Sequence, residues 1–270
     1  MGVEEGKPLH NNNHYGIVYP RKIQVISSLE TKMSQPSIVY NGGLLIERAE
    51  VFSIFWGKEW NEKLLNLRIS LDDFFKVILN SEVIDQLAEY NTEKYIIKHG
   101  KYLGSNNVID PMPASRRLND IDIQHFLKKQ IFTNSSIPKP TINMLYFIYL
   151  PPGIVSVVGT NISCNKEGEK PKMCAYHSNL FDPQAYYAVI PYPSCTDCFM
   201  GKQEDLDPLD AITALSSHEL CEAITDPIVG SGWCDPSTFL EIGDICETEL
   251  KNLGQYKIQR EWSNQKNGCF

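Results

Sequence analysis

Two uninterrupted apolar runs place the tightest limit on the fold. The runs INMLYFIYLPPG (residues 142–153) and AYYAVIPYP (residues 185–193) each have the length of one strand, and each is stopped by proline. Continuous apolar strands belong at the centre of a sheet covered on both faces, because a strand with one wet face alternates apolar and polar residues. Proline cannot donate to a strand ladder, so it marks where each run stops pairing. We therefore predict an α/β (α+β) fold: a mixed β-sheet with flanking helices.

Three segments carry helix signals. Ser70 and Asp73 form a capping-box pattern, and apolar residues follow at helical spacing as far as Ala88. Asp120 begins a second amphipathic segment. A third helix begins at the Asp-Pro pair 207–208, where proline occupies the first turn. Alternation of these helices with the strand-like runs is consistent with the predicted mixed sheet.

The remaining stretches point to one domain. Residues 37–57 hold β-branched and aromatic runs separated by turn signals, which predicts strands, whereas residues 100–113 have the composition of a loop. Residues 1–36 mix Asn, His, Gly and Pro without periodicity, which predicts an extended N-terminal arm. With 270 residues, 42% of them hydrophobic, the chain can bury a large core. We expect residues 37–270 to form a single catalytic-like domain.

Charge and hydropathy argue against several classes of partner. The chain has 25 basic and 33 acidic residues, a formal charge of −8, and no block of five like charges. We therefore expect no binding to nucleic acid or to an anionic membrane surface. No apolar run approaches the roughly 18–20 residues that span a bilayer. The first residues lack the features of a signal peptide, so on this ground the chain is cytoplasmic or has lost its leader.

The cysteines favour a different compartment. All eight lie beyond residue 163. Thiols crowded into one half of a chain suggest local disulfides, which persist in oxidising compartments, although buried free thiols give the same pattern. Cys195 and Cys198 could close a small loop, and Cys246 and Cys269 flank the C-terminal segment. We expect at least one of these two pairs to be oxidised.

The motif SHELCEAITDP, within the third helix, carries the strongest chemical signal. It places His218, Glu219 and Glu222 in the order H-E-x-x-E. His218 and Glu222 project only about 40° apart on a helix, one turn from each other, so both can bind one ion. H-E-x-x-H zinc hydrolases use this spacing, with the intervening glutamate as general base. We predict a Zn²⁺ site in which Glu219 is the base and Glu241 or Asp244 is the third ligand.

Other interpretations of these acidic residues remain open. His218 and Glu222 could form an ordinary ion pair on a solvated helix. A separate Ca²⁺ site could use Asp226 and Asp235 together with Glu241 and Asp244, because hard cations prefer many oxygen ligands. His177, in the segment MCAYHSNL, could line the pocket in a catalytic role, orienting a carboxylate or stabilising an oxyanion. The alternative for His177 is a structural, hydrogen-bonded histidine.

Five ordered motifs together resemble one known family. They are IVYNGGLLIERAEVFSIFWG, CAYHS, YYAVIPYPSCTDC, SHELCEAITDP and EIGDIC. From about Ser37 to its C-terminus the chain resembles the EXORDIUM-like, phosphate-induced protein family, and is closer to the bacterial and fungal members than to the plant ones. The resemblance implies an exported, extracellular protein. Plant members are associated with growth and the cell wall, and no enzymatic activity is attached to the family as a whole.

Two functions follow from the motif and the resemblance. The first is a zinc-dependent hydrolase, a metallopeptidase acting on a peptide or protein substrate. The second is a non-catalytic extracellular protein that binds a cell-wall polymer or another glycan and holds a structural metal. A coordination position left open for water distinguishes the two, because a structural zinc is closed by protein ligands.

Overall fold

The structure, a computed structural model, describes residues 15–18, 38–163, 171–182, 184–195, 198, 207–247 and 249–270. Its centre is a six-stranded sheet of spatial order β1-β9-β10-β6-β3-β4. These strands are β1 (Gly16–Val18), β3 (Glu50–Trp56), β4 (Lys101–Val108), β6 (Met144–Tyr149), β9 (Ala175–Phe181) and β10 (Gln184–Ile190). Strands β4, β3, β6 and β10 run parallel to one another, whereas β9 pairs antiparallel with both β10 and β1. The predicted mixed sheet is confirmed.

The two apolar runs form neighbouring central strands. Strand β6 is buried at every position, and β10 is buried at every position after Gln184. They pair in parallel, with Leu145 opposite Tyr186 and Tyr149 opposite Ile190. Continuous apolar sequence is required there because each strand is covered on both faces.

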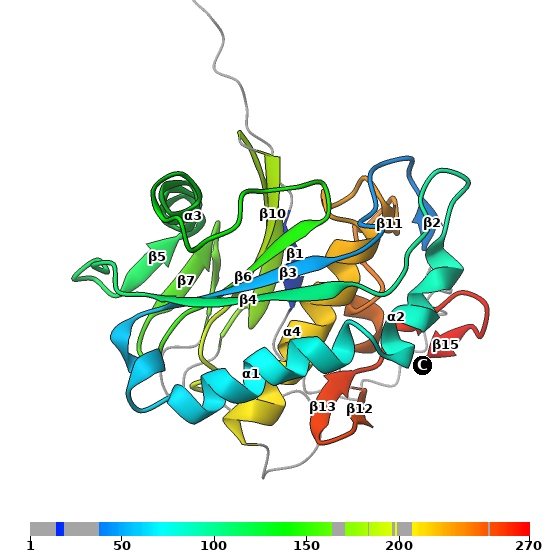
Figure 1. Ribbon diagram of the computed structural model, residues 1–270. Coiled ribbons are helices and arrows are strands. Elements are labelled where there is room, and N and C mark those ends of the chain that lie inside the picture. The colour runs from blue at the N-terminus through cyan, green and yellow to red at the C-terminus, as the bar shows by residue number, and fades with distance from the viewer. Residues whose placement is uncertain are drawn as a thin grey trace, which may run out of the picture.

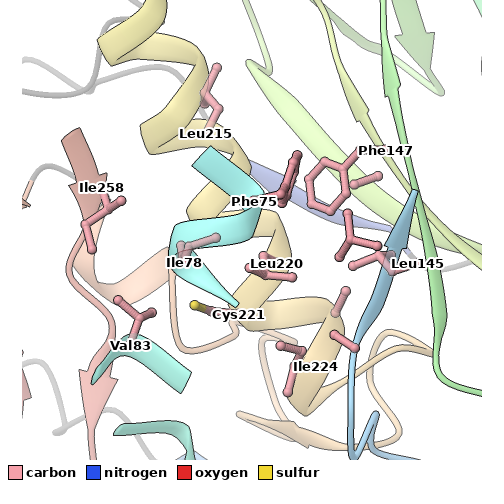
Figure 2. Packing of buried hydrophobic residues seen from close by; sticks show 14 of the residues in the cluster. Phe75, Ile78, Val83, Leu145, Phe147, Leu215, Leu220, Cys221, Ile224 and Ile258 are labelled. Atoms are coloured by element: carbon pink, nitrogen blue, oxygen red, sulfur yellow. The ribbon is translucent and has the colours of Figure 1, made fainter. Parts of the chain in front are cut away.

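Helices cover both faces of the sheet. They are α1 (Leu65–Ile78), α2 (Glu82–Gln86), α3 (Asp120–Thr133) and α4 (Pro208–Thr225). In Figure 1, α1 and α4 lie on one side of the sheet and α3 lies on the other. The protein has one hydrophobic core on each face of the sheet, and alternate residues of each strand point into one or the other. Leu145 and Phe147 pack with α1 and α4, whereas Tyr146 and Ile148 pack with α3. Figure 2 shows the first of these cores, in which Phe75 of α1 lies beside Phe147.

Short strands and turns complete the fold. The strands are β2 (Val39–Tyr40), β5 (Arg117–Asn119), β7 (Val155–Val158), β8 (Asn161–Ile162), β11 (Trp233–Cys234), β12 (Leu250–Leu253), β13 (Tyr256–Gln259), β14 (Trp262–Ser263) and β15 (Gly268–Cys269). Single 3₁₀ turns occur at Lys58–Asn61, Leu87–Tyr90 and Asp244–Cys246. Within the described ranges no helix is long and apolar enough to cross a membrane.

Two local predictions were wrong. The helix expected to begin at Ser70 begins at Leu65, and it ends at Ile78. Ser81 then caps a second, short helix by accepting a hydrogen bond from the backbone of Val83 at 3.3 Å. The stretch 100–113 was expected to be a loop, but it supplies strand β4. Because β4 is an edge strand with one partly exposed face, its sequence is polar and resembles a loop.

The N-terminal segment also contributes to the sheet. Residues 1–36 were expected to form an extended arm, but Gly16–Val18 pairs with β9 as an edge strand. The rest of that arm, apart from Tyr15, lies outside the described residues. Gly16 lies directly opposite His177 in this pairing. The segment therefore reaches the region that carries the predicted site.

Disulfides crosslink segments of the C-terminal half of the chain. Cys246 bonds to Cys269, as one of the two expected pairs, and Cys174 bonds to Cys198. The expected Cys195–Cys198 pair was wrong, because the sulfur of Cys198 reaches back to the start of β9. Cys195 also takes part in a disulfide. The free thiols within the described residues are those of Cys221 and Cys234, both buried.

Candidate metal centre

Helix α4 is a buried helix that carries polar side chains into the protein interior. Asp207 caps it by accepting a hydrogen bond from the backbone of Asp210 at 2.9 Å, and proline follows in the first turn. Every residue from Ala211 to Thr225 is buried. The helix packs against β9 and β10 on one side and against β13 on the other. His218 and Glu222 have no exposed surface, which excludes the alternative of an ion pair on a solvated helix.

A hydrogen-bond relay fixes the orientation of His218. The side-chain nitrogen of Gln259 donates to the carbonyl of Gly243 at 2.8 Å, so its amide oxygen faces His218. That oxygen lies 3.1 Å from Nδ1 of His218 and accepts its proton. In the neutral imidazole Nε2 then carries the lone pair. Second partners of this kind are typical of metal-binding histidines, because they fix the tautomer and the ring plane.

Nε2 of His218 faces two carboxylates. It lies 3.0 Å from Oε2 of Glu222 and 4.0 Å from Oδ1 of Asp244, and none of these three atoms has a hydrogen-bond partner within the described residues. The second oxygen of each carboxylate is held in place. Oε1 of Glu222 accepts from the backbone of Asp244 at 3.1 Å, and Oδ2 of Asp244 accepts from the backbone of Glu241 at 2.9 Å. One oxygen of each carboxylate is therefore anchored, and the other faces the histidine nitrogen.

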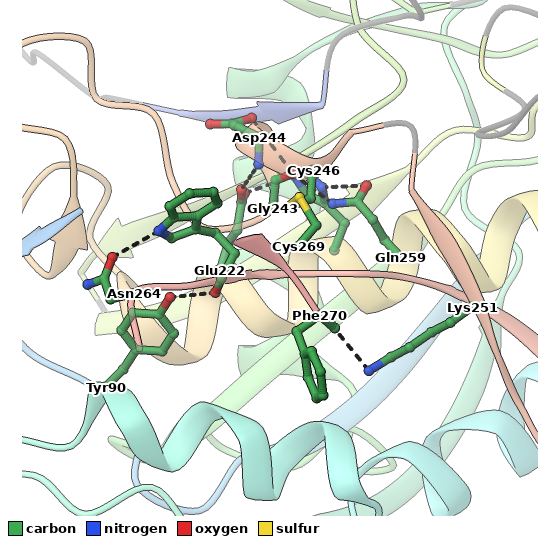
Figure 3. The surroundings of a disulfide bond; sticks show 12 residues. Tyr90, Glu222, Gly243, Asp244, Cys246, Lys251, Gln259, Asn264, Cys269 and Phe270 are labelled. Atoms are coloured by element: carbon green, nitrogen blue, oxygen red, sulfur yellow. Dashed lines mark hydrogen bonds and ion pairs between the residues drawn. A yellow bond between two sulfur atoms is a disulfide. The ribbon is translucent and has the colours of Figure 1, made fainter. Parts of the chain in front are cut away.

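The chain geometry explains why these residues meet. Glu222 and Asp244 lie beside the Cys246–Cys269 disulfide, together with Gly243 and Gln259 (Figure 3). A Cβ on Gly243 would lie 2.6 Å from Nδ1 of His218, so only glycine allows the backbone to approach the ring this closely. The disulfide and the glycine hold the loop that carries Asp244 against helix α4.

A second group of the same kind lies next to the first. His177 on β9 places Nδ1 3.1 Å from Oε2 of Glu219 and 3.7 Å from Oε2 of Glu222. Its Nε2 lies 3.3 Å from the backbone oxygen of Asp226 and 3.6 Å from Oε1 of Glu241. His177, Glu222 and Glu241 form one candidate metal-binding group, and His218, Glu222 and Asp244 form another; within each group the ligand atoms lie within 4.8 Å of one another. Glu222 belongs to both groups.

Burial and the neighbouring charges shift the pKa of every acidic group of the centre: burial would raise the pKa of Glu222, but His218 outweighs it and lowers that pKa. Burial, together with the nearby charge of Glu222, raises the pKa values of Glu241 and Asp244 well above their ordinary range. Burial also raises the pKa of Glu219 to about 7, although the two histidines partly oppose it. Burial would lower the pKa of His218, but the adjacent Glu222 outweighs it and raises that pKa strongly. Without a metal ion, the centre is expected to hold protons in place of a cation.

The residues fit a divalent cation. Imidazole nitrogen and carboxylate oxygen are ligands that Zn²⁺ accepts. The orphaned atoms are buried, and an unsatisfied buried carboxylate oxygen is costly unless a cation or a donor meets it. All six predicted site residues, namely His177, His218, Glu219, Glu222, Glu241 and Asp244, come together around Glu222. Surface pockets lie elsewhere, for example one of about 760 Å³ beside Lys251 and one of about 500 Å³ beside Arg116.

The separate calcium site does not assemble as expected. The carboxylate of Asp226 accepts hydrogen bonds from the backbone of Gly230, Ser231 and Gly232, and so closes the turn after α4. Asp235 accepts from the backbone and hydroxyl of Ser237. Neither aspartate belongs to a candidate metal-binding group within the described residues. Glu241 and Asp244, the other two members, belong to the two groups around Glu222.

Sequence reasoning missed the residues that support the site. Gln259 orients His218, and Gly16 and Gly243 allow the backbone to approach the two histidines. Only Gly243 carried a local signal, since it lies inside the motif EIGDIC. Gln259 and Gly16 reach the centre through strand packing, which no local pattern reveals. Buried Glu261, whose two oxygens also lack hydrogen-bond partners among the described residues, was missed for the same reason.

Comparison with known proteins adds no assignment. No model of a known protein family matches the chain. No curated protein matches it either. Function is therefore inferred from the side chains of the centre and from the motifs.

Proposed function

We propose that the chain is a zinc-dependent hydrolase in which His218, Glu222 and Asp244 bind Zn²⁺. One observation carries the proposal: the lone-pair nitrogen of His218 and the free oxygens of Glu222 and Asp244 converge, buried and without hydrogen-bond partners. Three protein ligands leave a fourth position for water, as catalytic zinc sites require. Zinc, when bound, lowers the pKa of that water and so supplies a nucleophile at neutral pH.

Glu219 is the proposed general base. It follows His218 directly in the helix, and its Oε1 has no hydrogen-bond partner within the described residues. Its Oε2 lies 3.1 Å from Nδ1 of His177, which fixes the rotation of the carboxylate. Glu219 can thus accept a proton at Oε1 while His177 positions it. A base held in this way contributes on the order of 10²–10⁴ to a hydrolytic rate.

A peptide or protein is the proposed substrate. The H-E-x-x-E helix is similar to the active-site helix of zinc peptidases, in which the same spacing supplies a ligand pair and a base. The motif resemblance to the EXORDIUM-like family, with its exported members, supports an extracellular setting. The two disulfides, Cys174–Cys198 and Cys246–Cys269, are consistent with that setting.

Hydrolysis of an unfolded protein tests the proposal. Purified chain would be freed of metal with a chelator, reloaded with Zn²⁺ and incubated with denatured casein and a mixed peptide library. Cleavage should need zinc and should disappear in the His218→Ala variant. The matched control is His125→Ala, because His125 lies on α3 on the opposite face of the sheet. Zinc-independent cleavage, or equal cleavage by His218→Ala, would overturn the assignment.

A second function is favoured by the burial of the centre. His218, Glu219 and Glu222 have no exposed surface, and 5% of the Asp244 side chain is exposed. A closed metal site of this kind suits a non-catalytic protein that binds a cell-wall polymer or another glycan and uses the ion for stability. In that case the zinc-loaded chain binds wall polysaccharide, chelation lowers its stability, and no cleavage is found with any substrate.

A further inference from the structure

The centre holds more negative charge than one divalent ion neutralises. Glu219, Glu222, Glu241 and Asp244 are all buried, and within the described residues their only ion-pair partners are His177 and His218. One Zn²⁺ balances two of the four carboxylates. Buried carboxylates are retained when they are paired or bind metal ions. Two divalent cations would balance all four.

His177 presents a lone pair in the same way as His218. Its Nε2 lies 3.3 Å from the backbone carbonyl oxygen of Asp226, which can only accept a hydrogen bond, so Nε2 carries the proton. Nδ1 faces carboxylate oxygens of Glu219 at 3.1 Å and Glu222 at 3.7 Å, so in the metal-free chain it donates a second proton, and after loss of that proton its lone pair can bind a cation. A ring nitrogen that faces two carboxylates needs either a proton or a metal cation between them. As with His218, the other ring nitrogen is tied to a neutral oxygen.

Glu241 supplies the unmatched carboxylate. It has no exposed surface, and neither of its oxygens has a hydrogen-bond partner within the described residues. It belongs to the group of His177 and Glu222, and does not belong to that of His218. The backbone of strand β1 closes this side, because a Cβ on Gly16 would lie 2.6 Å from Oε2 of Glu241 and still closer to the ring of His177. Glycine at residue 16 thus leaves room beside both ligands.

The two histidines belong to separate candidate groups that share Glu222. Oε2 of Glu222 lies 3.0 Å from Nε2 of His218 and 3.7 Å from Nδ1 of His177, and no candidate group within the described residues contains both histidines. Glu222, between them, is placed as a bridging carboxylate. Metal pairs in hydrolytic enzymes lie about 3.5–4 Å apart, a spacing that such a bridge allows.

We propose that His177 and Glu241 bind a second divalent cation, bridged by Glu222 to the ion held by His218 and Asp244. This inference rests on the first site of the proposed function and extends it from a mononuclear to a dinuclear centre. The second site has one imidazole and at least two carboxylates, a set that suits Zn²⁺ or the harder Mn²⁺. In the protein loaded with both ions His177 is a ligand, and it positions Glu219 only where the second site is empty.

Metal stoichiometry tests the second site. The full chain would be stripped with a chelator, dialysed against dilute Zn²⁺ and assayed for zinc per chain by mass spectrometry. The wild-type chain should hold two ions and Glu241→Gln one. Glu249→Gln, the same substitution at an exposed glutamate, should hold two. Circular dichroism would verify the fold of each variant.

The wild-type chain loaded with Mn²⁺ gives an independent answer, which holds even where Glu241→Gln does not fold. Two bridged Mn²⁺ ions give an exchange-coupled electron paramagnetic resonance spectrum, whereas separate ions do not. One zinc per chain in the wild type, kept by Glu241→Gln and lost by His218→Ala, would overturn the second site and leave the hydrolase proposal intact. Two ions without any hydrolysis would support the dinuclear centre and count against the hydrolase.

Discussion

The sheet carries one buried acidic cluster on each face, and the two are built in opposite ways. On the α3 face, Asp120 accepts hydrogen bonds from the hydroxyls of Tyr176 and Tyr187 at 2.8–2.9 Å and from the amide of Gln124 at 2.6 Å. On the α4 face, carboxylate oxygens of Glu222 and Glu219 face ring nitrogens of His218 and His177. Tyr176 and His177 are adjacent on β9 and point to opposite faces, so one strand serves both clusters.

The difference separates a structural carboxylate from a candidate metal ligand. Asp120 is surrounded by neutral donors, so its charge is stabilised by hydrogen bonds alone and no cation is needed. Glu222 has donors for one oxygen, while the other faces two imidazole nitrogens. Burial of an acidic side chain is therefore no sign of metal binding by itself. The sign is a buried carboxylate oxygen whose neighbours are imidazole nitrogens, because such a nitrogen can exchange its proton for a metal cation.

The largest expected effect comes from substituting the two glutamates of helix α4, because Glu219 is the proposed base and Glu222 is a proposed ligand. Glu219→Gln keeps the metal but removes the proton acceptor, so hydrolysis should fall by on the order of 10²–10⁴. Glu222→Gln puts a weak amide ligand in place of a charged oxygen, so metal and activity should both be lost. Parallel measurement of zinc content and peptide cleavage checks both. If Glu219→Gln lost the metal and Glu222→Gln kept it, the two roles would be reversed.

Glu261 offers a pH-dependent test on the same face. Burial, opposed by His218 and reinforced by Glu222, raises its pKa from 4.5 to about 8. The folded chain thus holds this proton more tightly than the unfolded chain, so stability is full below pH 4.5 and falls as the pH rises to about 8. Glu261→Gln should therefore be more stable than the wild type above pH 8, by at most about 5 kcal/mol.

Denaturant unfolding of the metal-free chain at both ends of this range measures the difference. The advantage of Glu261→Gln should shrink toward zero below pH 4.5, because the wild-type glutamate is then protonated in both states. An advantage of equal size at every pH would show that Glu261 does not carry the shifted pKa.

Removal of the metal should lower the stability that the α4 face contributes and should not change the hydrogen bonds around Asp120 on the α3 face. An ion present at about a thousand times its dissociation constant stabilises the fold by about 4 kcal/mol. Chelation should lower the free energy of unfolding by a similar amount. The shift should be the same in Asp120→Asn, since Asp120 meets only neutral donors. Calorimetry with and without chelator measures the change in stability, and an unchanged melting temperature would contradict a stabilising ion.

Asp120→Asn itself should have a smaller effect, confined to stability. Both tyrosine hydroxyls donate to Oδ1, so an amide oxygen there keeps them, but the new amide nitrogen replaces Oδ2 and faces the amide nitrogen of Gln124, which loses its acceptor. A buried polar group left without a partner costs about 1–3 kcal/mol. Urea unfolding should show a loss in this range, with metal content unchanged. Loss of metal from Asp120→Asn would remove the distinction between the two clusters.

Strand β1 gives the smallest expected effect, on the rate of metal exchange. Alanine at residue 16 would press its Cβ against His177 and Glu241 and push the strand away from the centre. Chelator should then extract the metal severalfold faster than from the wild type. Gly268→Ala is the matched control, because its nearest neighbour, the backbone oxygen of Lys266, lies 4.0 Å away. Equal rates for the two variants would show that β1 does not close the centre.

The sequence predicted a helix or strand correctly only where the residues of that element alone showed how it begins or how it is buried. Strands β6 and β10 were predicted because burial on both faces leaves a continuous apolar run, and helix α4 was predicted from the Asp-Pro pair at its first turn. Strand β4 was missed because an edge strand can be polar.

The candidate site shows the same division. His218, Glu219 and Glu222 lie on one helix, so their spacing revealed their geometry. Gln259 and Gly16 meet these residues only after strands distant in the chain have packed together. Their roles depend on contacts across the fold, and residue spacing carries no trace of them.

X-ray diffraction at the absorption edge of the bound metal, identified first by fluorescence, tests the central claim most directly. Crystals of the zinc-loaded chain should show an anomalous peak bonded to Nε2 of His218 and Oε2 of Glu222. No such peak should appear beside Asp120. The account would be contradicted if the loaded protein showed no anomalous peak near Glu222, with His218 and Glu222 joined by a direct hydrogen bond.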